Sequence, residues 1–189
     1  VELYEAGRIR RMAAKGGDKH TVFRIGEVDG SLSPRVAELA ALFSLIDSTK
    51  STTNLFGERW TKLCQNGMRN GIAAATGVTS GECDRNEVLR RFAIQLGGEA
   101  VRVGQALGYR LEKLGELDPE RLALASEGDA TALSEIEAIM VKRTASNPRA
   151  GIQRPSMAQD MAKGRRTEIE FMNGLIVEKG RQVGVPTPS

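Results

Sequence analysis

Three polar residues at one-turn spacing are the first feature of this sequence that could do chemistry. Lys62, Asn66 and Asn70 recur at i, i+4 and i+8, so on a helix they form one polar stripe. An ammonium on such a stripe can donate a proton to a carbonyl oxygen, and the neighbouring amides can orient a polar substrate. The apolar residues Trp60 and Cys64 lie beside the stripe. The spacing alone favours a simpler alternative, a solvated helix face, and both readings remain open.

Ser156, Asp160 and Glu168 form a second group of polar residues, nearer the C-terminus. On pattern alone, Ser156 is an N-cap, Asp160 is an acid that suits the helix dipole, and Glu168 is a surface ion-pair partner of nearby basic residues. His20 is the only histidine, and it has no acidic partner close in sequence. We expect Cys64 in the core. A Ser-His-Asp or Cys-His nucleophile is therefore not expected.

Motifs that bind cofactors or metals are missing from the sequence. It contains neither G-x-G-x-x-G after a strand nor G-x-x-x-x-G-K-[ST], so no cofactor-binding residue is identified in this chain. Gly97, Gly98 and Gly104 lie within a helical pattern, where they allow close packing of helices rather than phosphate binding. Nothing near Cys64 and Cys83 has the spacing of zinc ligands, so we expect no metal site.

The elements that must position these side chains change in character near residue 54. Residues 1–19 are charged and contain glycine, which indicates a turn or a poorly ordered segment. A strand is expected from His20 to Val28, a helix opened by Ser33-Pro34, and a short strand from Ser48 to Asn54. Helical periodicities follow one another from residue 55. We expect helices over 56–76, 85–108, 119–126, from Asp129 onward and over 156–183, with a loop over 147–155.

The sequence therefore predicts a mainly α fold preceded by a short β-α-β unit. We expect two domains, the tail end of an α/β arrangement over 1–54 and a helical domain over 55–189. On one unbroken helix, Ser156 and Glu168 would lie about 120° apart, at about 100° per residue. Both can face one cleft only if the helix breaks between them, and Gly164 is the candidate position for that break.

Composition argues against several classes of protein. The 189 residues carry 27 Lys+Arg against 24 Asp+Glu, and this net charge of +3 is a weak electrostatic footprint for a nucleic-acid binder. No apolar run approaches the roughly 20 residues of a membrane span, and the N-terminus lacks the features of a signal peptide. We expect a cytoplasmic protein with free thiols. The missing initial methionine and the proline-containing end lead us to expect a piece of a longer protein.

Several motifs, in this order and spacing, resemble ketopantoate reductases from about residue 20 to the end of the chain. The W-x-K-L-x-x-N segment that opens the C-terminal domain of that family is matched at 60–66, and its S-M-x-Q-D segment at 156–160. The T-E-I-D-x-x-N-G signature is matched at 167–174, with Glu170 at the aspartate position. Further matches are G-V-P-T-P at 184–188 and I-G-E-x-x-G at 25–30.

The resemblance implies an NADPH-dependent oxidoreductase that reduces 2-dehydropantoate, also called ketopantoate, to pantoate in pantothenate and coenzyme A biosynthesis. A similar branched 2-oxo acid is the other substrate that the resemblance allows. The family has an N-terminal Rossmann domain, which binds NADPH and of which residues 1–54 would be the end. Its C-terminal domain is helical, like that of 6-phosphogluconate dehydrogenase, and the active site lies in the cleft between the two. The resemblance also implies a homodimer and a chain that is inactive by itself.

Roles for single residues follow from the same resemblance. Lys62 matches the catalytic lysine, which hydrogen-bonds the ketone and supplies a proton. Glu168 matches the glutamate that contacts the reacting oxygen or the adjacent hydroxyl and keeps the lysine oriented. The substrate-binding positions of the family are matched by Asn66, Asn70, Ser156 and Asp160.

Two residues depart from the family's pattern. Arg69 stands where an apolar residue is usual, and Gly71 replaces a proline. A related two-domain dehydrogenase acting on another 2-oxo acid is therefore an alternative. Others are a non-catalytic helical dimerisation module, whose polar stripe is only a solvated face, and a nucleic-acid binder, which the balanced charge disfavours. The joint presence of Lys62, Ser156 and Glu168 favours an enzyme, since dimerisation does not require it.

Overall fold

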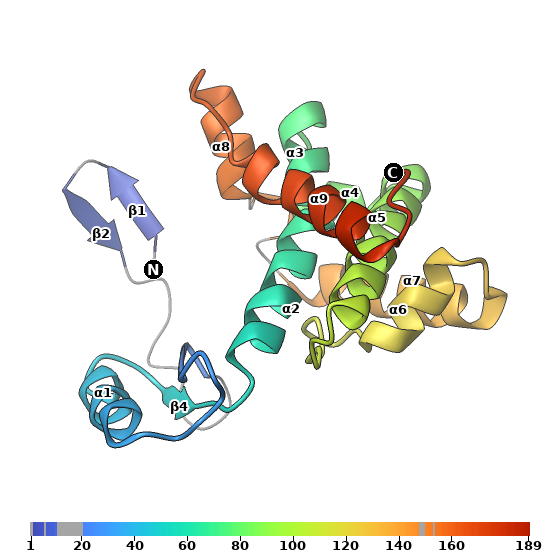
Figure 1. Ribbon diagram of the computed structural model, residues 1–189. Helices are drawn as coiled ribbons and strands as arrows, with labels where there is room; N and C mark the ends of the chain where they lie inside the picture. The colour runs from blue at the N-terminus through green and yellow to red at the C-terminus, as the bar shows by residue number, and fades with distance from the viewer. Residues whose placement is uncertain (1, 6, 11–20, 148–149, 153) are drawn as a thin grey trace. The chain divides into compact units, whose positions relative to one another are not determined.

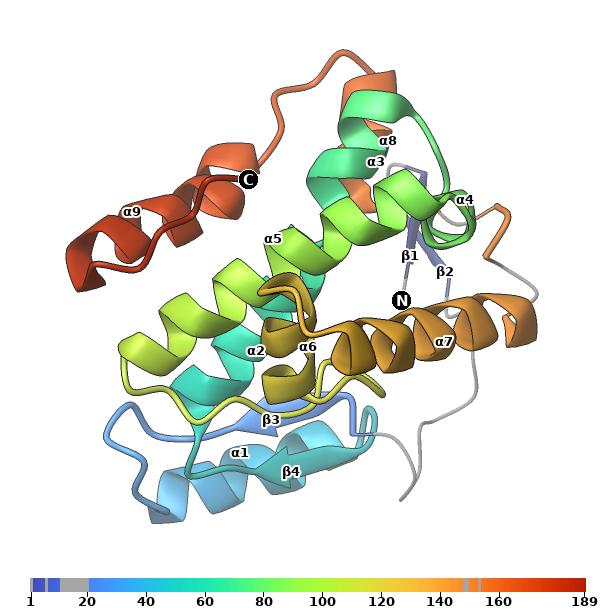
Figure 2. The same cartoon turned by 90° about the vertical axis from the view of Figure 1, so that its right-hand side faces the viewer.

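The computed structural model describes residues 2–5, 7–10, 21–147, 150–152 and 154–189 (Figures 1 and 2). The chain divides into two compact units, Val1–Phe56 and Gly57–Ser189. The expected fold class is confirmed, because helices dominate and a short parallel pair of strands precedes them. None of the described helices combines the length and the apolar character that crossing a bilayer requires. Outside the described residues lie His20, residues 11–19, and residues 148, 149 and 153 of the predicted loop.

A strand–helix–strand arrangement occupies residues 23–51 of the first unit. In it, β3 (Phe23–Ile25) pairs in parallel with β4 (Thr49–Ser51), and α1 (Pro34–Ser44) connects them. The hydroxyl of Ser33 caps α1 by accepting from the backbone N–H of a residue in its first turn. The rings of Phe23 and Phe43 meet edge to face at 5.1 Å, which holds α1 against β3.

An antiparallel hairpin lies near the start of the chain, where we expected a turn or a poorly ordered segment. Its strands are β1 (Glu2–Glu5) and β2 (Arg8–Arg10), with Leu3 opposite Ile9. Gly7 between them has a φ of 75°, a left-handed conformation that glycine adopts without strain. For the strand residues the expectation was wrong, because strands of 4 and 3 residues offer too few alternating positions to be recognised.

The second unit is helical, and α5 runs through it as its longest helix (Figure 2). The bounds of its helices are α2 (Leu55–Gly67), α3 (Asn70–Thr76), α4 (Ser80–Arg85), α5 (Glu87–Ala106), α6 (Pro119–Ser126), α7 (Ala130–Ser146), α8 (Ser156–Ala162), the 3₁₀ turn η2 (Ile169–Phe171) and α9 (Asn173–Val183). The helices expected around 119–126 and after Asp129 are present, and Asp118 and Asp129 cap them.

Two of the expected long helices are divided. The helix expected over 56–76 breaks at residues 68–69, which separates α2 from α3. The stretch expected over 156–183 consists of α8, η2 and α9. Gly164 follows the end of α8 with a φ of 63°, so the break predicted at this glycine is confirmed. The sequence prediction missed α4, which begins with a capping box between Thr79 and Glu82.

Glycines in α5 let neighbouring helices approach closely. A Cβ on Gly97 would lie 2.7 Å from Cγ of Met68, and one on Gly104 would lie 2.4 Å from the ring of Trp60. The indole N–H of Trp60 also donates to the backbone carbonyl of Ala100 at 2.9 Å. The packing role expected for these glycines is confirmed. Together these contacts fix α2 against α5.

Candidate active site

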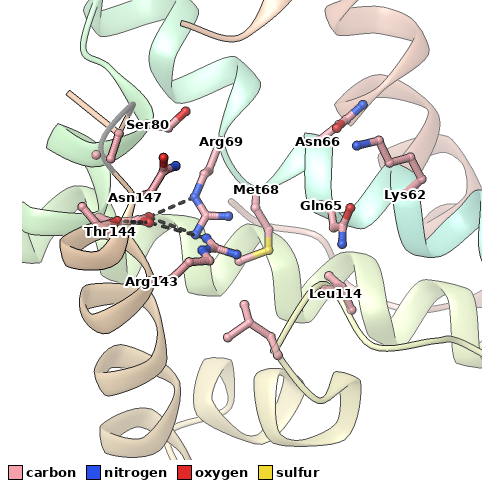
Figure 3. Close-up of a pocket in the computed structure, with 14 residues that line it drawn as sticks. Lys62, Gln65, Asn66, Met68, Arg69, Ser80, Leu114, Arg143, Thr144 and Asn147 are labelled. Atoms are coloured by element: carbon pink, nitrogen blue, oxygen red, sulfur yellow. Dashed lines mark hydrogen bonds and ion pairs between the residues drawn. The ribbon is translucent and has the colours of Figure 1, made fainter. Parts of the chain in front are cut away.

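Lys62 and Asn66 lie one turn apart on α2 and line the same pocket, which has a volume of about 320 Å³ (Figure 3). The opposite face of α2 is in the core, where Cys64 is fully buried and Trp60 nearly so. Lys62 is exposed, and no described residue forms an ion pair with its ammonium. Its three N–H donors are therefore available to a ligand.

Asn70 does not continue this stripe. It is the first residue of α3, on the far side of the break at residues 68–69, and only 8% of its surface is exposed. Its amide donates to the sulfur of Met172 at 3.8 Å. The prediction of one helical stripe through Lys62, Asn66 and Asn70 was wrong, because α2 ends before the third residue.

The stretch that follows Glu168 packs against the junction between α2 and α3. The amide of Asn173 donates to the backbone carbonyl of Gly67 at 3.1 Å. A Cβ on Gly71 would lie 3.3 Å from Cδ1 of Ile169, so this glycine leaves room for η2. Gly71, which departs from the family's pattern, is therefore part of the contact that places the Glu168 segment beside α3.

Ser156 and Asp160 lie on α8, which packs beside α3 (Figure 1). The interpretation of Ser156 as an N-cap was wrong, because Pro155 takes that position and no side chain caps the helix. Asp160 lies beyond the first turn, so the proposed dipole role was also wrong. Ser156 is exposed and Asp160 is half-buried, whereas Met157 and Ala158 between them are in the core.

Glu168 is exposed and immediately precedes η2. Its backbone carbonyl accepts from the N–H groups of Phe171 and Met172, each at 3.0 Å. Arg166 pairs instead with Glu170, at 3.5 Å, and no described residue forms an ion pair with Glu168. The ordinary interpretation of Glu168 as a surface ion-pair partner therefore finds no support among the described residues.

A buried aspartate organises the side of the pocket away from Lys62. Oδ1 of Asp84 accepts from Nε of Arg69 at 2.9 Å, and Oδ2 accepts from the hydroxyl of Thr144 at 2.8 Å. Nη2 of Arg143 lies 3.5 Å from Oδ2. The side chain of Asp84 is only 3% exposed. These residues come from the α2–α3 turn, α4 and α7.

Sequence analysis did not assign these residues to the site. They are separated by 15 to 60 positions along the chain, and no local pattern connects them. The one signal was Arg69 itself, a charged residue at a usually apolar position. Burial and the neighbouring Arg69 lower the pKa of Arg143.

Both cysteines are buried and unsuited to nucleophilic chemistry. Burial raises the pKa of the Cys64 thiol to about 12 and that of the Cys83 thiol to about 11. Both thiols are therefore protonated at neutral pH, and thiolate is the nucleophilic form. The core role expected for Cys64 agrees with this environment.

The loop after β3 leaves no room for a ligand beside Gly26. In the loop after β3, a Cβ on Gly26 would lie 2.3 Å from the backbone oxygen of Thr52, so chain already fills that space. Glu27 in the same loop pairs with Arg35, which holds the pKa of its carboxyl at about 2. No group of three His, Cys, Asp or Glu side chains among the described residues could hold a metal ion.

Comparisons with known proteins place this arrangement in a family. The family described as "Ketopantoate reductase PanE/ApbA C terminal" matches residues 54–189. A 2-dehydropantoate 2-reductase of Archaeoglobus fulgidus is 30% identical over 162 residues, which make up 85% of this chain and 46% of that protein. The chain thus spans about half the length of the curated relatives it matches.

Solved structures share the fold. The PanE/ApbA family ketopantoate reductase from Ralstonia eutropha is 26% identical, with a TM-score of 0.64 over 89% of this chain and 48% of that one. D-mandelate dehydrogenase with NADH and anilino(oxo)acetate is 22% identical, with a TM-score of 0.67 over 89% of this chain and 62% of that one. A dimeric ketopantoate reductase from Staphylococcus aureus is 19% identical, with a TM-score of 0.62 over 87% and 48%. The chain belongs to the ketopantoate reductase family, and its residues 54–189 match the C-terminal domain of that family.

Proposed function

We propose that this chain is the substrate-binding half of an NADPH-dependent reductase that converts 2-dehydropantoate to pantoate, with Lys62 and Glu168 as its catalytic residues. The observation that carries the proposal is that the ammonium of Lys62, with which no described residue forms an ion pair, lines a pocket with Asn66 one helical turn away. The membership of the chain in the family supports the same reaction.

When bound, the nicotinamide of NADPH would supply the hydride that reduces the carbonyl carbon. The ketone oxygen then gains negative charge, which a fixed ammonium stabilises more in the transition state than in the ground state. Lys62 donates the proton that completes the hydroxyl group. Glu168 orients that ammonium and accepts from the new hydroxyl. The remaining polar groups of the substrate are bound by the other matched positions, Asn66, Asn70, Ser156 and Asp160.

The buried position of Asn70 suggests that Asn66 and Asn70 have different roles. Its amide nitrogen donates to Met172, while Asn66 is the residue that lines the pocket beside Lys62. We therefore assign the direct substrate contact mainly to Asn66. Asn70 holds η2, and hence the Glu168 segment, against α3.

NADPH binding is proposed for the part of the full-length protein that this chain does not span. Residues 1–54 would be the end of that nucleotide-binding domain, and residues 55–189 the substrate-binding and dimerisation domain. On this proposal the chain alone is inactive, since hydride transfer needs the cofactor held against the substrate. A homodimer is consistent with the exposed apolar residues of α5, Val88 and Phe92.

The test is NADPH oxidation with ketopantoate, measured on the full-length protein as wild type and as Lys62→Ala. Loss of a general acid typically lowers kcat by about 10² to 10⁴-fold, and we expect a decrease in this range with the fold intact by circular dichroism. Lys179→Ala is the matched control, because this lysine lies on α9 and donates to Gln182. Equal turnover by Lys62→Ala and wild type would remove Lys62 from the mechanism.

A wild-type protein that reduces another 2-oxo acid, but not ketopantoate, would keep the mechanism and change the substrate. Arg69, at a usually apolar position, favours this second candidate function. A wild-type protein that reduces no 2-oxo acid would contradict the catalytic proposal and leave a dimerisation module as the remaining interpretation.

A further inference from the structure

The pocket beside Lys62 carries more positive charge than reduction of a ketone requires. Figure 3 shows Lys62 and Asn66 on one side of it, and Arg69, Arg143 and Thr144 on the other. Three cationic side chains line the pocket, against one acidic side chain among the described lining residues. The cations are Lys62, Arg69 and Arg143, and the acid is Asp84.

Asp84 engages the two arginines unequally. Its closest contacts are the 2.9 Å hydrogen bond from Arg69 and the 2.8 Å hydrogen bond from Thr144. Arg143 makes only the 3.5 Å contact, although a guanidinium carries five N–H donors. Glu116 also attracts Arg143, but it is exposed and does not line the pocket. Arg143 therefore retains donors that no described carboxylate satisfies.

We infer that Arg143 and Arg69 bind a second carboxylate of the substrate, so that the protein prefers linear 2-oxo dicarboxylic acids to 2-oxo acids with an uncharged tail. The inference rests on the reductase chemistry of the proposed function, which places the ketone at Lys62, and it favours the second candidate, another 2-oxo acid, over 2-dehydropantoate. The forked geometry of a guanidinium matches a carboxylate, and such charge-assisted hydrogen bonds are stronger than neutral ones.

The spacing of the two sides suits an extended substrate. Lys62 lies on α2, and Arg69 lies on the turn beyond the end of that helix. Both side chains line the same pocket, on different sides of it. An acid with a carboxylate at each end can then place its ketone at one side and its terminal carboxylate at the other.

The structural alternative is that the arginines only hold helices together. Asp84 on α4 connects the α2–α3 turn with α7, and such a cross-link contributes to folding whether or not a ligand binds. On that alternative, replacing Arg143 changes stability but leaves the choice between two substrates of equal length unaltered. The ratio of two specificity constants separates the alternatives.

The experiment compares 2-oxoadipate with 2-oxohexanoate, which have the same number of carbons and differ in the terminal carboxylate. We would measure kcat/KM for both acids with NADPH on the full-length protein. We expect the wild type to prefer 2-oxoadipate by about 10- to 100-fold, the range of one charge-assisted pair. In Arg143→Gln the ratio should fall to about threefold or less, while Arg143→Lys retains part of it.

Arg181→Gln is the matched control, because this arginine is exposed on α9 and does not line the pocket. It should leave the ratio unchanged. If Arg143→Gln fails to fold, Arg69→Lys serves as the second variant, since it keeps the charge and loses the forked contact. Its ratio should fall below that of the wild type.

A second measurement does not depend on turnover. The increase in Tm that each acid causes in the absence of cofactor should be larger for 2-oxoadipate in the wild type, and equal for both acids in Arg143→Gln. Equal kcat/KM for the two acids, or reduction of ketopantoate alone, overturns the inference and leaves the proposed function standing. If no 2-oxo acid is reduced, the proposed function is wrong, and equal increases in Tm then overturn the inference as well.

Discussion

The side-chain amide of Asn173 donates a 3.1 Å hydrogen bond to the backbone carbonyl of Gly67, the last residue of α2. Carbonyl groups at the end of a helix have no partner within that helix, so this amide satisfies one of them. Because Asn173 begins α9, the bond connects the helix of Lys62 to the segment that contains Glu168. The helix that carries Lys62 and the segment that carries Glu168, the two proposed catalytic residues, are therefore held together by this hydrogen bond although they are far apart in the sequence.

Replacing Asn173 by alanine should lower the free energy of unfolding by about 1 kcal/mol, the typical net contribution of one hydrogen bond. Asn173→Asp should lower it further, since a carboxylate would face both a carbonyl oxygen and the negative end of the α2 dipole. Urea denaturation followed by circular dichroism measures both. An aspartate variant as stable as the wild type would show that this amide does not cap α2 in solution.

Asp84→Ala should destabilise the protein by about 3 kcal/mol, because it leaves partly buried arginines without their acceptor. The double variant Arg69→Met/Asp84→Leu removes charge and partner together, so we expect a smaller loss. The comparison of the midpoints in a denaturant titration tests this prediction. Equal losses would show that an unpaired Arg69 is not the cause of the destabilisation.

Gly104→Ala should lower stability by about 1 to 3 kcal/mol, the usual cost of overfilling a core. The new Cβ would lie 2.4 Å from the ring of Trp60. Gly174→Ala is the control, because its Cβ would meet its nearest neighbour at an ordinary 3.5 Å within α9. That variant should be as stable as the wild type or slightly more stable. In thermal denaturation, the Tm of Gly104→Ala should fall clearly below that of the wild type, whereas the Tm of Gly174→Ala should stay equal to it or rise slightly.

The thiols of Cys64 and Cys83 should not react with a disulfide reagent at pH 8 while the protein is folded, and both should react after unfolding in urea. Their raised pKa values, about 12 and about 11, mean that the folded state keeps protons that the unfolded state releases above its value of 9.0. Their contribution to stability is therefore present below pH 9 and lost as the pH rises through the folded values. In Cys64→Ala, the decrease in Tm between pH 9 and pH 11 should be smaller than in the wild type. Rapid labelling of the folded protein would contradict the burial of these thiols.

The parts of the fold that depend on local rules could be predicted from the sequence. Ser33, Asp118 and Asp129 are capping residues beside helical patterns, and all three begin helices as expected. The break at Gly164 followed from geometry, since Ser156 and Glu168 could not otherwise share a cleft. The break at residues 68–69 was not predicted, because apolar residues at helical spacing, Cys64, Met68 and Ile72, continue across it. The Asn-Gly pairs at 66–67 and 70–71 are a local signal for it.

The site could be predicted only where a motif carries it. Lys62 and Asn66 line one pocket, although their spacing alone favoured a solvated helix face. The cluster of Arg69, Asp84 and Arg143 depends on tertiary packing, which brings residues up to 59 positions apart into contact. Composition and periodicity contain no information about such tertiary contacts. The predicted roles of Glu168, Ser156 and Asp160 stay predictions that the proposed kinetics can test.

The turn between α2 and α3 also bears on how proteins of this kind can diverge. Lys62 belongs to a helix that Trp60 anchors to α5, whereas Arg69 lies on the turn beyond the end of that helix. A substitution at position 69 can alter the far side of the pocket without shifting the anchored lysine. On the proposed function, new substrates would become accessible through single substitutions at this turn, while the end of the pocket at Lys62 stays unchanged.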